Sequence, residues 1–142
     1  MENNYYIPEI EEFHVGFEFE FKDDFDKTWD KTIIKTQSQL CNWTAFDDIN
    51  KRVKYLDKED IESLGFKYKE TNRIRYWYTS DCFFDMPNSP SHRCSKLTLI
   101  HDPEYSTISI EGVISSVEEK IFEGTIKNKS ELKKLMKQLN II

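Results

Sequence analysis

The sequence predicts an α+β protein with an antiparallel, strand-dominated sheet of about six or seven strands. Residues 13–22 alternate between apolar and polar side chains, which is typical of a strand with one buried face. Turn-forming residues separate several further alternating stretches. Leucines at helical spacing near the end predict a C-terminal helix packed on one face of the sheet. Periodicity leaves open whether the sheet is curled.

The first segment, residues 1–12, is expected to be a lead-in to the sheet, because Pro8 breaks regular structure. A strand over 13–22 follows. Its buried row would hold Phe13, Val15, Phe17, Phe19 and Phe21. His14, Glu18 and Glu20 would share the opposite, polar face.

The sequence of the middle of the chain predicts shorter strands and helices. Residues 29–36 favour a second strand, whereas the apolar residues of 37–50 have only partly helical spacing. A short inserted helix over about 58–64 is predicted, because Asp57 suits the N-cap and Gly65 suits the left-handed position after the last turn. A hairpin of two strands is expected from residue 66 to residue 79.

The last third of the chain begins with residues 80–93, which contain two prolines and predict a long loop. Strands are expected over 95–101, 106–111 and 119–127. The C-terminal helix, about 129–140, has Asn128 as N-cap and Glu131 three residues later, as in a capping box. We expect this helix to cover the apolar side of the first strand.

Size and composition indicate a single domain over residues 1–142 in a cytoplasmic protein. The chain has 142 residues, a net charge of −6 and three cysteines, too few for a disulfide framework. Residues 1–30 carry ten acids and two lysines, so the chain lacks the basic footprint of a duplex-DNA binder. No apolar run approaches the roughly 18 residues of a membrane span.

Two groups of residues are predicted to bind. Arg73, Arg75 and Trp77 would share one strand face, where they could stack a base and clamp a phosphate or form a protein-binding hot spot. The second group is the polar face with His14, Glu18 and Glu20. It could hold Mg²⁺ together with nearby aspartates, could be a solvated face, or could pair with the arginines across the sheet.

Signals for metal or nucleophilic chemistry are weak. Cys82, His92, Cys94 and His101 have the spacing C-x9-H-x-C-x6-H, which matches no common zinc pattern. No G-x-S-x-G, P-loop or G-x-G-x-x-G motif is present. We therefore expect no metal site, no catalytic residue and no cofactor.

Three stretches resemble a family of small uncharacterised proteins of phages and mobile elements of Bacteroidetes-type bacteria. They are YIPEIEEFHVGFEFE within residues 5–20, VKYLDKEDIESLGF (53–66) and IFEGTIKNKSELKKLMKQL (121–139). The resemblance implies a phage-type protein in the cytoplasm of a bacterial host, acting on host machinery. It implies no activity and no catalytic residue.

The leading hypothesis is a small intracellular binding protein without catalytic activity, which engages a host protein or assembles with itself and could counter host defence. The acidic N-terminal region or the Arg73, Arg75 and Trp77 face would make the contact. One alternative is a binder of a small nucleotide-like ligand. A second alternative is a metal-dependent phosphodiesterase or nuclease that uses the acidic group.

Overall fold

The computed structural model describes residues 4–45, 49–72, 74–80, 84–86, 89–114 and 117–139. The chain divides into two compact units, Met1–Tyr55 and Leu56–Ile142, and each has its own buried hydrophobic cluster. The predicted α+β, strand-dominated class is confirmed, but the described strands form two antiparallel sheets rather than one. The expectation of a single domain over 1–142 stays a prediction.

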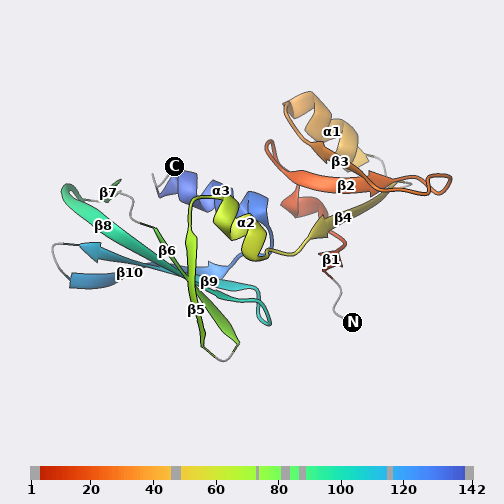
Figure 1. Cartoon of the computed structure of the whole chain (residues 1–142). Helices are drawn as coiled ribbons and strands as arrows, with labels where there is room; N and C mark the ends of the chain where they lie inside the picture. The colour runs from red at the N-terminus through yellow and green to blue at the C-terminus, as the bar shows by residue number, and fades with distance from the viewer. Residues whose placement is uncertain are drawn as a thin grey trace. The chain divides into compact units, whose positions relative to one another are not determined.

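The first unit contains a four-stranded antiparallel sheet with the strand order β1-β4-β2-β3 (Figure 1). Its elements are β1 (Tyr5–Tyr6), a 3-10 helix (Ile10–Glu12), β2 (Glu18–Lys22), β3 (Asp30–Ile33), α1 (Gln37–Ala45) and β4 (Asn50–Lys54). The chain therefore returns from α1 to place its last strand between the first two.

The phenylalanines of the predicted buried row, which we call the aromatic row, form the core of this unit, whereas Val15 is 47% exposed. The strand β2 is shorter than the predicted strand over 13–22. Gly16 has a φ of +97°, in a turn that ends before β2 begins at Glu18. Phe17 and Phe19 are buried, and the Trp43 ring of α1 lies 5.0 Å from the Phe19 ring. The expectation that the C-terminal helix covers this row is wrong, because α1, in the ambiguous stretch 37–50, supplies the cover.

The second unit contains a six-stranded antiparallel sheet with the order β10-β9-β8-β6-β5, and β7 pairs with β8. Its elements are α2 (Lys58–Ser63), β5 (Lys67–Asn72), β6 (Arg75–Ser80), β7 (Phe84–Met86), β8 (Ser89–Asp102), β9 (Thr107–Ile114), β10 (Val117–Thr125) and α3 (Lys129–Gln138). Figure 1 shows α2 and α3 next to each other over this sheet.

Both predicted helices of this unit are confirmed. The carboxylate of Asp57 accepts the backbone N–H of Asp60 at 2.9 Å, and Gly65 has a φ of +100° after the last turn of α2. Leu132, Leu135 and Met136 of α3 are buried with the core residues of β8 and β9. The C-terminal helix therefore packs on one face of the second sheet.

The prediction of a long loop over 80–93 is wrong in its described part. Residues 84–86 form β7, and β8 already begins at Ser89. Asp85 lies opposite Arg93, and Phe84 lies opposite Cys94. Pairing between the two strands therefore outweighs the turn-forming composition that predicted a loop.

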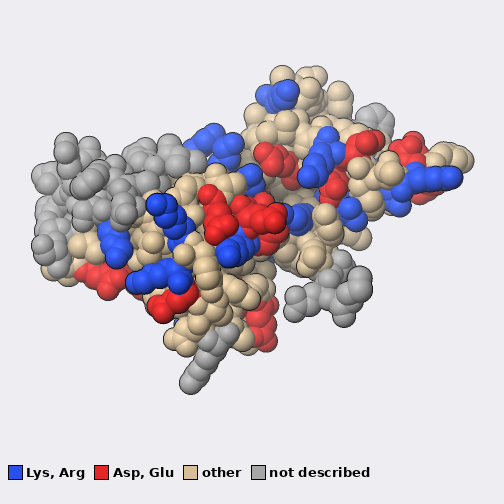
Figure 2. Space-filling model, in the orientation of Figure 1, with Lys and Arg blue, Asp and Glu red and all other residues tan. Residues whose placement is uncertain are grey.

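The surface and the helices add two general facts. Acidic and basic side chains are intermixed over the face of the molecule that Figure 2 shows, without a wide area of one sign. No helix in the described ranges has the length and apolar character that crossing a membrane requires.

The cap of α3 gives a test of the fold. The buried side chain of Asn128 accepts the backbone N–H of Glu131 at 2.9 Å. We expect Asn128→Ala to lower the free energy of unfolding by about 1–2 kcal/mol, because that N–H loses its partner. Urea denaturation measures the change. Gln138→Ala, at an exposed position of the same helix, should stay within about 0.5 kcal/mol of the wild type. Equal effects of the two substitutions would contradict the role of the cap.

Candidate functional site

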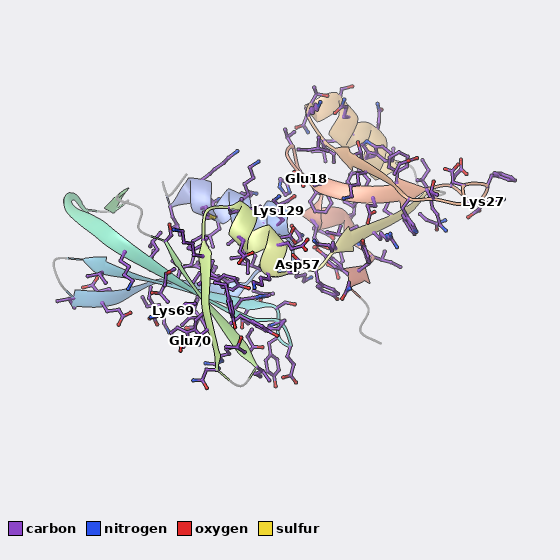
Figure 3. The ribbon with its side chains drawn as sticks, in the orientation of Figure 1. Glu18, Lys27, Asp57, Lys69, Glu70 and Lys129 are labelled. Atoms are coloured by element: carbon purple, nitrogen blue, oxygen red, sulfur yellow. The ribbon has the colours of Figure 1, made fainter. Side chains whose placement is uncertain are left out.

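The predicted binding residues belong to different units. His14, Glu18 and Glu20 lie in the first unit, and Figure 3 shows Glu18 at the start of β2. Arg75 and Trp77 lie on β6 of the second unit. Arg73 lies outside the described residues.

His14 does not share a strand face with Glu18 and Glu20, because it precedes β2 and the turn at Gly16. Its Nδ1 lies 2.8 Å from the backbone oxygen of Glu12, and its ring centroid lies 5.5 Å from that of Phe17. The histidine is therefore tied to the segment before the sheet. Whether His14 binds a partner stays a prediction.

Two of the three residues of the predicted Arg73, Arg75 and Trp77 face lie on β6, and both are on the same side of the sheet. Tyr78 is buried in the core and Tyr76 packs against it, so Arg75 and Trp77 point to the opposite side of the sheet. The Nε of Arg75 lies 3.6 Å from Oδ2 of Asp102. The arginine thus has an acidic partner within its own sheet.

The Trp77 side chain leaves one polar atom without a partner. Its Nε1 is buried and makes no hydrogen bond to any described residue. A buried N–H in that state costs about 1–3 kcal/mol. The binding roles predicted for Arg75 and Trp77 stay predictions.

Glu20 has a partner that the sequence analysis missed. Its Oε2 lies 3.2 Å from Nε of Arg52, which is directly opposite on β4. The Cζ of Arg52 also lies 3.8 Å from the ring centroid of Tyr5 and 4.2 Å from that of Trp29. The guanidinium is therefore held between two aromatic rings and a carboxylate, an arrangement that fixes its position.

Beside this stack lies a pocket with a volume of about 910 Å³, which we call the hollow. Its aromatic lining is Tyr5, Tyr6, Phe13, Trp29, Trp43 and Tyr55. Its other lining residues are Ile7, Pro8, Ile10, Thr44, Ile49, Asn50, Lys51 and Arg52. All of them belong to the first unit.

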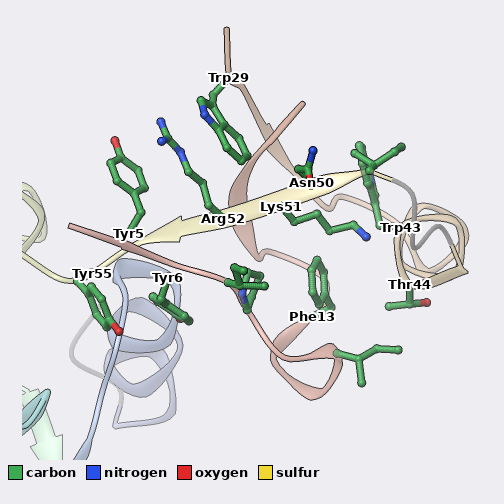
Figure 4. A pocket seen from close by; sticks show the side chains of 14 residues that line it. Tyr5, Tyr6, Phe13, Trp29, Trp43, Thr44, Asn50, Lys51, Arg52 and Tyr55 are labelled. Carbon is green, nitrogen blue, oxygen red and sulfur yellow. The ribbon is translucent and has the colours of Figure 1, made fainter. Parts of the chain in front are cut away.

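The hollow runs along β4, with side chains on both sides of the strand. Figure 4 shows Tyr5, Trp29 and Arg52 on one side and Phe13, Trp43 and Lys51 on the other. Neighbouring residues of a strand point to opposite faces, so the adjacent pair Lys51 and Arg52 places one cation on each side.

The early end of β1 explains why the hollow is present. Tyr5 lies opposite Lys54 and Tyr6 lies opposite Val53, so a longer β1 would bring Pro8 opposite Lys51. Proline has no backbone N–H for the next ladder bond. The chain turns instead into the 3-10 helix Ile10–Glu12, and the hollow lies beyond the end of β1.

The charge of the hollow is opposite to that of its unit. Residues 1–55 contain twelve acids and seven lysines and arginines, which gives a net charge of −5. Among the described residues that line the hollow, two are cationic and none is acidic, although one of the cations, Arg52, is paired with Glu20. The site therefore favours a ligand with aromatic or aliphatic groups and negative charge.

Of the four residues in the weak metal pattern, only His101 has a described side chain, and Cys82 lies outside the described residues. In the described part of the chain, no group of three or more His, Cys, Asp and Glu side chains is placed to hold a metal ion. His101 is buried on the core face of β8, opposite Tyr76 and Ile108. Asp102 takes the other face, where it meets Arg75.

The hollow could have been suspected only in part from the sequence. Pro8, two residues after a pair of tyrosines, indicates an interrupted strand, and adjacent Lys51 and Arg52 in a strand indicate cations on both faces. Nothing local indicates that Trp29 meets Arg52. Comparisons of the chain with protein-family models, curated proteins and solved structures found no match.

The buried histidine predicts a pH dependence of stability. Burial lowers the pKa of His101 from 6.5 to about 4, although Asp102 and Asp57 act in the opposite direction. Between pH 6.5 and pH 4 the His101 side chain binds a proton in the unfolded chain but not in the folded chain, so the free energy of unfolding falls as the pH falls. From pH 7 to pH 4 the wild type should lose about 3 kcal/mol more than His101→Gln.

Urea denaturation of both proteins at several pH values measures this difference. The carboxylates titrate in both proteins, so their contribution cancels in the comparison. Parallel stability curves for the two proteins would contradict the role assigned to His101.

Proposed function

We propose that this chain is a binding protein without catalytic activity, and that the hollow of its first unit engages a protein partner. The observation that carries the proposal is the composition of the hollow and its rim. Aromatic rings and the Lys51 and Arg52 pair lie beside apolar side chains that face solvent. Tryptophan, tyrosine and arginine dominate the hot spots of protein interfaces.

The exposed side chains that line the hollow, which we call its rim, favour a macromolecular partner over a small ligand. Ile7 is 83% exposed, Ile10 58% and Tyr55 39%, and all three line the hollow. Large apolar side chains gathered at one exposed place are typical of interaction sites. A partner that covered them would remove apolar area from water, which stabilises a complex by roughly 25 cal/mol per Å² before the costs of association.

The charge indicates the chemistry of the partner. Lys51 and Arg52 would attract an acidic segment, and the rings would accept its aromatic or aliphatic side chains. The resemblance to phage-type proteins adds the context of the proposal. In that context the partner is a host protein or a second copy, the compartment is the bacterial cytoplasm, and the role is to counter host defence.

A nucleotide-like ligand is the second candidate. The volume of about 910 Å³ lies within the roughly 300–1,000 Å³ of small-molecule sites. Aromatic faces stack on bases and cationic side chains bind phosphate, so the lining suits such a ligand as well. The exposed isoleucines of the rim favour the protein partner instead.

Selection from a random peptide library tests the first candidate. We expect wild-type protein to enrich peptides with acidic and aromatic or aliphatic residues. Lys51→Glu and Ile10→Asp should each weaken these peptides by at least about tenfold, because each places negative charge in the hollow. Binding is measured by fluorescence polarisation.

Lys35→Glu is the matched control, since it makes the same charge change at an exposed residue outside the hollow. It should leave peptide affinity within about twofold of the wild type. If all three variants bind equally, or if no peptide is enriched by a protein that stays monomeric, the hollow is not a protein-binding site.

Thermal unfolding with a panel of nucleotides tests the second candidate. A ligand at 100 times its Kd should stabilise the wild type by about 2.7 kcal/mol, and Lys51→Glu should abolish that gain. Absence of any shift across the panel would exclude the nucleotide candidate and would leave the protein candidate intact.

A further inference from the structure

The turn between β2 and β3 exposes an aromatic side chain. Phe25 is 95% exposed, more than any other large hydrophobic side chain described. The surrounding sequence is Asp23-Asp24-Phe25-Asp26-Lys27, which we call the tip, and its net charge is −2. Figure 3 shows Lys27 at the outer end of this hairpin.

Hydrogen bonds within the turn hold the tip in shape. The Oδ1 of Asp23 accepts the backbone N–H groups of Phe25 at 2.9 Å and Asp26 at 3.2 Å. The Oδ2 of Asp26 accepts the N–H of Asp23 at 3.3 Å. The Phe25 side chain is therefore presented on an ordered turn, so a partner that covers it loses little backbone entropy.

The tip and the hollow are complementary. The tip offers one aromatic ring between acidic side chains. The hollow offers aromatic walls with Lys51 and with Arg52, which Glu20 partners from outside the lining. A volume of about 910 Å³ has room for a phenylalanine side chain and its neighbours. The acidic and aromatic ligand expected for the hollow is thus found within this chain.

We propose that the tip of a second copy occupies the hollow, and that two copies exchange tips in a closed dimer. This inference rests on the proposed function, since it names the partner of the same site. Phe25 would enter among the rings, and the aspartates beside it would approach Lys51 and Arg52.

The place of the tip supports an exchange between two equal copies. Asn50 lines the hollow, and its Nδ2 donates to Oδ1 of Asp24 at 3.1 Å. Tip and hollow are therefore neighbours within one unit, as a twofold interface requires when the same surface serves both copies. One such interface contains two equal contacts and closes after two copies.

Sedimentation equilibrium over a wide concentration range tests the dimer. We expect a monomer–dimer equilibrium for the wild type, and Phe25→Ala should weaken it at least about 30-fold, because both anchors are lost. Tyr105→Ala is the matched control, since it removes another exposed aromatic side chain, 66% exposed, in the second unit. That variant should dimerise as the wild type does.

Mixing two variants gives a sharper test. Phe25→Ala has an intact hollow and no anchor, whereas Ile10→Asp has an intact anchor and an altered hollow at an exposed residue. Each alone should dimerise much more weakly than the wild type, and a mixture should form mixed dimers through the one remaining contact. A fluorescent label on one variant reports those dimers, and their absence would contradict the exchange of tips.

The outcomes separate this inference from the proposed function. A wild type that stays monomeric, or a dimer that Phe25→Ala leaves unchanged, would overturn the exchange of tips. If the hollow still binds selected peptides in a manner sensitive to Lys51→Glu, the proposed function stands without it. If it binds no peptide and the wild type also stays monomeric, both are wrong.

Discussion

The arrangement of the strands in the first unit depends on the position of the Arg52 side chain. Its guanidinium contacts Tyr5 of β1, Glu20 of β2 and Trp29, the residue before β3. One side chain of β4 therefore contacts two other strands of the sheet and the residue before the third. The Nζ of Lys22 lies 5.1 Å from the centroid of the same Trp29 ring. The rings that hold the arginine also line the hollow, so the interaction that orders the sheet also shapes the site.

The fold class and the helix caps were predictable because their signals are local. Alternation within a few residues placed the aromatic row, and the caps at Asp57 and Asn128 marked where α2 and α3 begin. The partner of the aromatic row was not predictable, because choosing between α1 and α3 depends on packing between distant segments. The weak amphipathic pattern of residues 37–45 concealed the correct choice, since only Leu40 and Trp43 pack on the core.

Most of the candidate site could not be predicted from the sequence, for the same reason. Glu20 was recognised as a polar strand residue, but its partner Arg52 is 32 residues away in the chain. The strand predicted from the sequence placed His14 on the same face as Glu18, whereas the turn at Gly16 separates the two residues. Arg75 was recognised with its correct face, yet its ion pair with Asp102 required the register of β6 against β8.

The distribution of charge limits how such a protein can associate. A chain with a net charge of −6 repels its own copies at long range, and screening weakens that repulsion beyond about 10 Å in ordinary salt. Close contact between copies is then favourable only where cations and exposed apolar groups lie together. In the first unit the hollow combines Lys51 and Arg52 with the exposed Ile7 and Ile10, while the acidic tip carries Phe25. Acidic charge elsewhere thus opposes unspecific association and favours the proposed contact between tip and hollow.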